Sequence, residues 1–163
     1  MPVSKLNIEV QINGTSYMAT VEPRLTLLDF IRDVAGLNGT HIGCEHGICG
    51  ACSILLDGIP IRACLMLAVQ ADGRRITTVE GLSNSDGTSG ILQDAFIEAH
   101  GMQCGYCTPG MLISAHALLT ENNNPSLDEI KDAIGGNLCR CTGYVQIIES
   151  IQLAAERLRQ GSP

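Results

Sequence analysis

The chain has 163 residues, a formal net charge of −7 and eight cysteines. This length allows one domain or two small ones. The negative charge argues against nucleic acid or an anionic membrane as a partner, and no apolar run approaches the ~20 residues that a membrane-spanning helix needs. Residues 1–10 carry no export signal. We therefore expect a cytoplasmic, reducing setting, in which thiols more often hold metals than form disulfides.

A β-hairpin and a helix are predicted at the start of the chain. Apolar and polar residues alternate over 6–12 and again over 15–21, and the Asn13-Gly14 dipeptide between them favours a type I′ turn. Thr26 then begins a capping-box-like sequence, after which apolar residues recur at helical spacing as far as Gly36. These elements predict a small sheet crossed by one helix.

Three cysteines with the spacing Cys-x4-Cys-x2-Cys follow this helix. They are Cys44, Cys49 and Cys52, and Cys64 comes after eleven more residues. This arrangement is typical of the loop that holds a plant-type 2Fe-2S cluster. The loop glycines, which are Gly43, Gly47 and Gly50, would allow positive φ and turn backbone N–H groups towards sulfur.

Two other metal sites share part of this pattern. A structural zinc site also takes four cysteines, but its usual form is two Cys-x2-Cys pairs. A Rieske centre needs two histidines in place of two cysteines. Cys44 is followed by Glu45-His46, but no Cys-x2-His occurs in the chain. We therefore interpret His46 as a solvated loop residue.

The sheet is predicted to end near residue 80. Strands are expected over 53–56 and 75–79, with a short apolar segment over 64–69. The polar, glycine-rich segment 81–90 predicts a linker. We therefore assign residues 1–80 to a first domain and 91–163 to a second.

The second domain is predicted to be helical throughout. The sequence signals are the apolar stripe over 91–99, Thr108-Pro109 as N-cap and first helical residue, a capping box at Ser126 that opens a helix ending at Gly135-Gly136, and a stripe over 144–158. Four short helices predict a bundle.

Two further cysteine pairs lie at the ends of these predicted helices. They are Cys104-Gly-Tyr-Cys107 and Cys139-Arg-Cys141. Bringing two helix ends together would place four thiolates at one site. Zinc would accept such a site, and only the neighbouring ferredoxin-like loop favours iron.

Three motifs together resemble the iron-sulfur subunit of the molybdenum hydroxylases, the family of xanthine dehydrogenase, aldehyde oxidoreductase and aerobic carbon monoxide dehydrogenase. They occupy residues 41–52, 103–111 and 136–144, in the order found in the family. The resemblance covers nearly the whole chain. It implies an α+β fold, with an N-terminal β-grasp plant-type ferredoxin domain followed by a C-terminal four-helix-bundle 2Fe-2S domain.

The resemblance also implies roles for particular residues. The cluster nearer FAD would be held by Cys44, Cys49, Cys52 and Cys64. The cluster nearer molybdenum would be held by Cys104, Cys107, Cys139 and Cys141. Gln103 and Cys141 would also contact the molybdopterin.

The chain is therefore expected to transfer electrons from a molybdopterin centre through two 2Fe-2S clusters to FAD, with no catalytic residue of its own. No Gly-x-Gly-x-x-Gly follows a predicted strand. By resemblance, FAD and molybdopterin, in its cytosine dinucleotide form, would lie on a medium and a large partner subunit in a dimer of heterotrimers. The expected substrate is an N-heteroaromatic compound or an aldehyde. A free two-cluster ferredoxin and a zinc-stapled interaction module are the alternatives.

Overall fold

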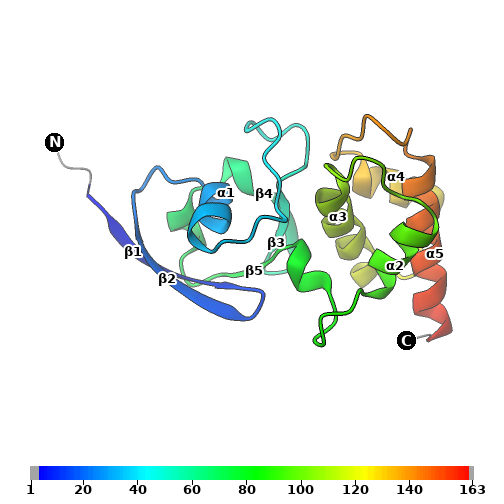
Figure 1. The fold of residues 1–163 in the computed structure, drawn as a ribbon, viewed down its shortest axis with the longest axis horizontal. Coiled ribbons are helices and arrows are strands. Elements are labelled where there is room, and N and C mark those ends of the chain that lie inside the picture. The colour runs from blue at the N-terminus through cyan, green and yellow to red at the C-terminus, as the bar shows by residue number, and fades with distance from the viewer. Residues whose placement is uncertain (1–3, 162–163) are drawn as a thin grey trace.

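The computed structural model describes residues 4–161. Figure 1 shows two lobes side by side, one built on a sheet and the other on helices. The strands of the described sheet are β1 (Leu6–Ile12), β2 (Thr15–Val21), β3 (Ser53–Leu56), β4 (Ile59–Arg62) and β5 (Arg75–Thr77). Their order is β2-β1-β5-β3-β4, and the β1–β5 pair is parallel while the other pairs are antiparallel. The predicted small sheet is confirmed, and it is mixed.

The predicted hairpin is formed by β1 and β2. Ile12 pairs with Thr15, and the two residues between them both have positive φ, 51° at Asn13 and 82° at Gly14. Positive φ at both central positions is the requirement of a type I′ turn. Alternate residues of β1, from Ile8 to Ile12, point into the core, as the alternation predicted.

The predicted helix after the hairpin comprises α1 (Leu27–Asp29) and a π-helical turn, η1 (Phe30–Val34). The Thr26 Oγ1 accepts a hydrogen bond from the backbone N of Asp29 at 3.0 Å, so the predicted cap is present. The buried face of this segment covers the core side of the sheet.

Three details of the first lobe differ from the sequence predictions. Strand β4 was not predicted, because its four residues include Pro60, and proline is disfavoured within a sheet except at an edge. Instead of a plain apolar segment over 64–69, the chain forms the 3-10 turns η2 (Ala63–Leu65) and η3 (Ala68–Ala71). Strand β5 stops at Thr77, and the 3-10 turn η4 (Val79–Leu82) follows it.

The described part of the second lobe contains the helices α2 (Ile91–Glu98), α3 (Thr108–Glu121), α4 (Leu127–Ile134) and α5 (Val145–Gln160). They pack around a second core that includes Phe96, Met111 and Ile147, all fully buried. The Ser126 capping box is present as predicted. The cap of α3 is Cys107 rather than the predicted Thr108, which is instead the first helical residue. A cysteine at the helix end brings the metal-binding motif directly against the helix.

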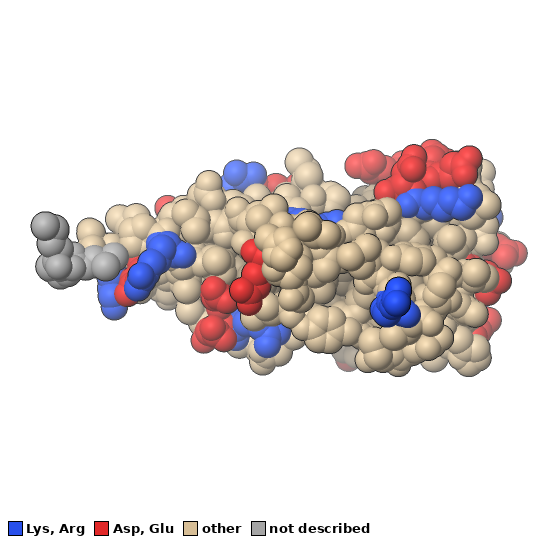
Figure 2. All heavy atoms as spheres, turned by 90° about the horizontal axis from the view of Figure 1, so that it is seen from above, with Lys and Arg blue, Asp and Glu red and all other residues tan. Residues whose placement is uncertain are grey.

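None of the helices described between residues 4 and 161 is both long and apolar enough to cross a membrane. Figure 2 shows acidic side chains gathered over the outer end of the helical lobe, while much of the visible middle is uncharged.

His116, half-buried on α3, should make the chain less stable in mild acid. Burial lowers the pKa of His116 below its ordinary value of 6.5. The unfolded chain therefore binds a proton that the folded chain resists, so stability is complete above pH 6.5 and falls as pH drops below it. We expect His116→Gln to flatten the fall in melting temperature between pH 7.5 and 5.5. Equal pH slopes for His116→Gln and the parent would contradict the account.

Candidate metal centres

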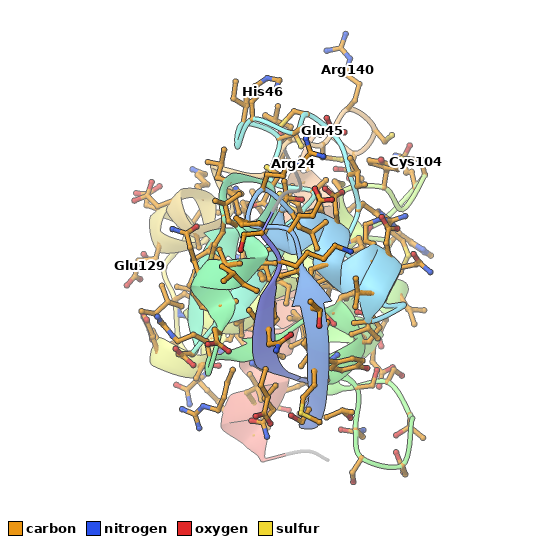
Figure 3. The ribbon with its side chains drawn as sticks, turned by 90° about the vertical axis from the view of Figure 1, so that its left-hand side faces the viewer. Arg24, Glu45, His46, Cys104, Glu129 and Arg140 are labelled. Carbon is orange, nitrogen blue, oxygen red and sulfur yellow. The ribbon has the colours of Figure 1, made fainter. Side chains whose placement is uncertain are left out.

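All eight cysteines are free thiols. Seven of them lie in loops or next to a helix or strand, and Cys64 lies within the 3-10 turn η2. Figure 3 shows Glu45 and His46, from the first cysteine loop, at the same end of the molecule as Arg140 from the second. Cys104 lies near this end as well. The fold therefore brings the two cysteine motifs, which are far apart in sequence, onto one region of the surface.

Backbone N–H groups point at sulfur in the first loop. The N–H groups of Ile48 and Cys49 each donate to Cys44 Sγ, with N to S distances of 3.3 Å. Gly47 and Gly50 have positive φ, 82° and 74°, as predicted. These donors stabilise a thiolate, and they are the contacts that tune an iron-sulfur cluster.

Gly43 is not among the positive-φ glycines, so its predicted role is wrong. Glycine is required at this position because there is no room for a side chain. A Cβ at this position would lie 2.7 Å from Cys49 Sγ, far closer than two such atoms can approach. Close contact between backbone and sulfur therefore selects glycine here.

Cys44 and Cys52 of the first set differ in the direction of their pKa shifts. Backbone hydrogen bonds, chiefly from Cys49, lower the pKa of Cys44 from 9.0 to about 6. Burial raises the pKa of Cys52 to about 11, and interactions with the Cys64 side chain add to this rise. A coordinating metal removes the proton from such a buried thiol outright, so the raised pKa of Cys52 does not prevent it from serving as a metal ligand.

The cysteine side chains of the second set also interact with one another. Cys104 Sγ and Cys141 Sγ are 3.4 Å apart. Cys107, whose pKa burial raises to about 12, interacts most closely with Cys139 among the other cysteines. Cys139 Sγ also lies 3.2 Å from Thr142 Oγ1. Two loops on different helix ends therefore supply one group of four sulfurs.

Side-chain hydrogen bonds link the cysteines of each set two by two. The pairs are Cys44 with Cys49, Cys52 with Cys64, Cys104 with Cys141, and Cys107 with Cys139. Across residues 4–161, no three Asp, Glu, His or Cys side chains are placed to hold one metal ion. A 2Fe-2S cluster shares four cysteines between two irons. Both sets fit this group, because each offers two pairs of thiols.

A hollow of about 170 Å³ lies between the two sets. It is lined by Gly43, Cys49 and Ala51 from the first loop and by all four cysteines of the second set, with Tyr106, Leu138 and Arg140. Cys49 of the first set therefore lies beside the four cysteines of the second set.

Gln103 and Cys141 lie at the surface of this site. Both are exposed, and Gln103 directly precedes Cys104. They are accessible to a cofactor carried by another chain.

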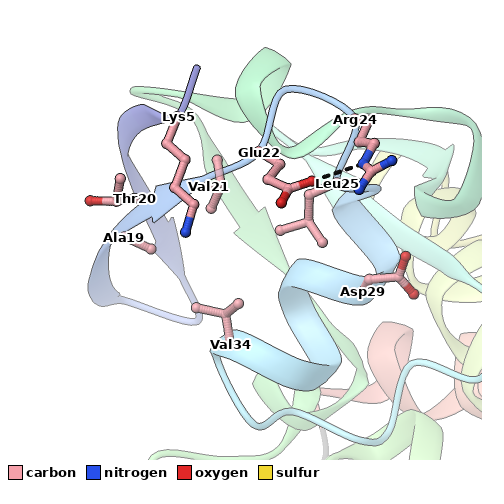
Figure 4. A pocket seen from close by; sticks show the side chains of 9 residues that line it. All are labelled: Lys5, Ala19, Thr20, Val21, Glu22, Arg24, Leu25, Asp29 and Val34. Carbon is pink, nitrogen blue, oxygen red and sulfur yellow. Dashed lines mark hydrogen bonds and ion pairs between the residues drawn. The ribbon is translucent and has the colours of Figure 1, made fainter. Parts of the chain in front are cut away.

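A wider pocket of about 450 Å³, between β2 and α1, is lined by no cysteine (Figure 4). It includes the Glu22–Arg24 ion pair, at 2.8 Å, and is separate from the candidate centres.

The spacing patterns did not reveal the residues that join the two lobes behind the cysteines. Asn137 and Arg62 connect residues 50–62 with residues 136–137 through hydrogen bonds. Asn137 lies inside the motif at 136–144, but nothing in its spacing indicates a contact with a loop 87 residues earlier. The only local signal was its position two residues before Cys139.

Two domain families match the chain. A 2Fe-2S iron-sulfur cluster binding domain matches residues 10–78, and a second 2Fe-2S binding domain matches residues 78–152. Together these matches contain all eight cysteines.

Relatives of known activity match along almost the whole chain. The small subunit of nicotine 6-hydroxylase from Paenarthrobacter nicotinovorans is 49% identical over 92% of this chain and 90% of its own. Subunit gamma of caffeine dehydrogenase from Pseudomonas sp. (strain CBB1) is 53% identical over 89% of this chain and 88% of its own.

Solved structures agree with these relatives. A chain of quinoline 2-oxidoreductase from Pseudomonas putida 86 is 51% identical, with a TM-score of 0.91 over 98% of this chain and 99% of that one. Aldehyde oxidoreductase from Desulfovibrio gigas is 37% identical, with a TM-score of 0.89 over 97% of this chain but 18% of that longer one. With both cysteine sets matched by 2Fe-2S domain families, these likenesses show that the chain belongs to the small iron-sulfur subunits of the molybdenum hydroxylases.

Proposed function

We propose that this chain carries electrons within a multi-subunit molybdenum hydroxylase, from a molybdopterin centre to FAD. The observation that carries the proposal is the presence of two adjacent groups of paired cysteine thiols in one chain. When bound, two 2Fe-2S clusters supply one-electron relays. The chain's own residues hold these clusters, donate hydrogen bonds to their sulfur ligands and fix the spacing between them.

The proposed ligands follow the two cysteine sets. The ferredoxin-domain cluster is held by Cys44, Cys49, Cys52 and Cys64, and the helical-domain cluster by Cys104, Cys107, Cys139 and Cys141. Their pairing supports this division. Gln103 and Cys141 are the proposed contacts to molybdopterin, and their exposure beside the second set supports this role.

The proposed partners are a large molybdopterin subunit and a medium FAD subunit, assembled as a dimer of heterotrimers in the cytoplasm. Apolar side chains are exposed around the candidate centres, with Ile48 62%, Leu65 66% and Leu138 54% exposed. Exposed apolar side chains grouped in this way are typical of surfaces that partners cover. The family resemblance further supports the β-grasp and four-helix-bundle assignments, a first domain over 1–80, a linker over 81–90 and a second domain over 91–163.

An N-heteroaromatic substrate is favoured for the complex over an aldehyde. The relatives at 49–53% identity are named for nicotine and caffeine, and a matching structure at 51% for quinoline. All three are nitrogen heterocycles. The aldehyde oxidoreductase of Desulfovibrio gigas is less similar, at 37% identity.

Copurification separates this function from that of a free ferredoxin. A tagged form of this chain, expressed in its native host, should retain two larger chains in fixed ratio, together with molybdenum and FAD. Leu138→Glu should weaken this retention because it places a charge among the exposed apolar side chains, whereas Leu127→Glu, at an exposed site on α4, should not. Recovery of the parent chain alone, with its clusters intact, would favour the free ferredoxin.

A further inference from the structure

A buried group of hydrogen bonds joins the two lobes behind the cysteine loops. Its centre is Asn137, whose side chain is 1% exposed. The Asn137 Nδ2 donates to the carbonyl oxygen of Gly50 at 3.0 Å and to Ser53 Oγ at 3.3 Å. Its Oδ1 accepts from Ser114 Oγ at 2.9 Å. One amide of the helical lobe is thus bonded to the first lobe by both of its N–H groups.

Arg62 reinforces this contact from the sheet. Its guanidinium donates to the carbonyl oxygen of Gly136 at 2.7 Å, to Asn137 Oδ1 at 3.4 Å and to Ser53 Oγ at 2.5 Å. Ser53 Oγ in turn donates to the Gly50 carbonyl at 2.5 Å. Hydrogen bonds from a charged donor are stronger than neutral ones, so the two lobes are held by a connected network.

The backbones of the two lobes approach too closely for side chains to fit between them. A Cβ at Gly50 would lie 2.5 Å from the carbonyl oxygen of Gly136. A Cβ at Gly110, on α3, would meet the carbonyl oxygen of Gly50. A Cβ at Gly136 would meet the guanidinium of Arg62. Because close-packed interiors have low compressibility, these contacts leave little room for one lobe to shift against the other.

This fit positions a direct link between the cysteine sets. The backbone N–H of Leu138 donates to the carbonyl oxygen of Cys49 at 2.9 Å. Leu138 is bonded to Cys139, so a single hydrogen bond and a few covalent bonds connect a cysteine of the first set with one of the second. Asn137 directly precedes Leu138 and Gly50 directly follows Cys49, so the hydrogen bond between Asn137 and Gly50 lies next to this backbone hydrogen bond.

We propose that Asn137 is a positioning residue for electron transfer between the two clusters. By holding the Gly50 segment, it keeps the Cys49 carbonyl on the Leu138 N–H and fixes the separation of the two centres. The inference rests on the proposed function, in which Cys49 and Cys139 are cluster ligands. Electronic coupling falls steeply with separation, so a small displacement of one loop slows transfer without altering either centre.

The test compares Asn137→Ala with Asn123→Ala, a control at an exposed asparagine of the α3–α4 connection, in the assembled complex. Three quantities are measured: iron per chain, the magnetic interaction between the two reduced clusters in the EPR spectrum, and the rate at which substrate reduces FAD. We expect Asn137→Ala to retain about four irons and both EPR signals. The magnetic splitting should be lost or broadened, and FAD reduction should slow on the order of tenfold. Asn123→Ala should match the parent.

The outcomes separate this inference from the proposed function. Unchanged splitting and rate in Asn137→Ala, with the irons retained, would overturn the positioning role and leave the proposed function intact. Fewer than about four irons in the parent chain would overturn the proposed function, and the inference with it. If Asn137→Ala does not assemble, Ser53→Ala decides, since it removes one member of the network. A smaller change of the same kind supports the role, and an unchanged splitting overturns it.

Discussion

Replacing Cys107 with alanine should reduce the iron content from about four to about two atoms per chain and abolish one of two EPR signals. Cys107 interacts with Cys139 and is the N-cap of α3. With three thiolates left, one iron loses its full ligand set and the cluster is not retained. Substrate should then no longer reduce FAD in the complex, because one relay is missing. Iron analysis, EPR and rapid-mixing spectroscopy measure these three effects.

Cys64→Ala provides the matched comparison. Cys64 belongs to the first set, where it is paired with Cys52. This variant should lose about two irons as well, but the EPR signal that disappears should be the one that Cys107→Ala retains. The account would be contradicted if both substitutions removed the same signal, or if either left the iron content unchanged.

Replacing Gly50 with alanine should destabilise the chain by about 2–5 kcal/mol, the sum of ~1–2 kcal/mol for a side chain at positive φ and ~1–3 kcal/mol for overpacking. Gly50 has a φ of 74°, and its added Cβ would lie 2.5 Å from Gly136 O and 2.8 Å from the Asn137 amide. The lobes must therefore separate or the loop must shift. Urea denaturation of the purified chain measures the loss.

Gly58→Ala separates backbone strain from the clash. Gly58, in the turn between β3 and β4, has a φ of 87°, and a Cβ there would meet no atom within 4 Å. This variant should be destabilised only by the backbone strain, by ~1–2 kcal/mol. Equal losses for the two variants would show that close packing between the lobes does not constrain Gly50.

Local chemistry made the first elements predictable. Asn13-Gly14 specifies its own turn, and the side chains of Thr26 and Ser126 reach backbone N–H groups only three residues away. The cysteine spacing was informative for the same reason, since Cys44 receives its hydrogen bonds from residues four and five positions later. Where the interacting atoms are neighbours in the chain, the pattern predicts the structure.

Long-range contacts were not predictable in this way. Gly43 is glycine because of the sulfur of Cys49 folded over it, and not because of its own φ. Arg62 and Asn137 meet across 75 residues, and their roles depend on how the two lobes pack. Strand β4 likewise forms because β3 lies beside it, despite the proline in its sequence. In each case the deciding interaction lies outside any local window of sequence.

The most direct test of two 2Fe-2S clusters in this chain is the amount of iron and acid-labile sulfide per chain, with EPR of the dithionite-reduced protein at two temperatures. The account predicts about four irons, about four sulfides and two distinct rhombic signals. About two irons, or zinc in place of iron, would mean that the cysteines of the helical lobe serve another purpose, and would contradict the proposed electron-transfer role.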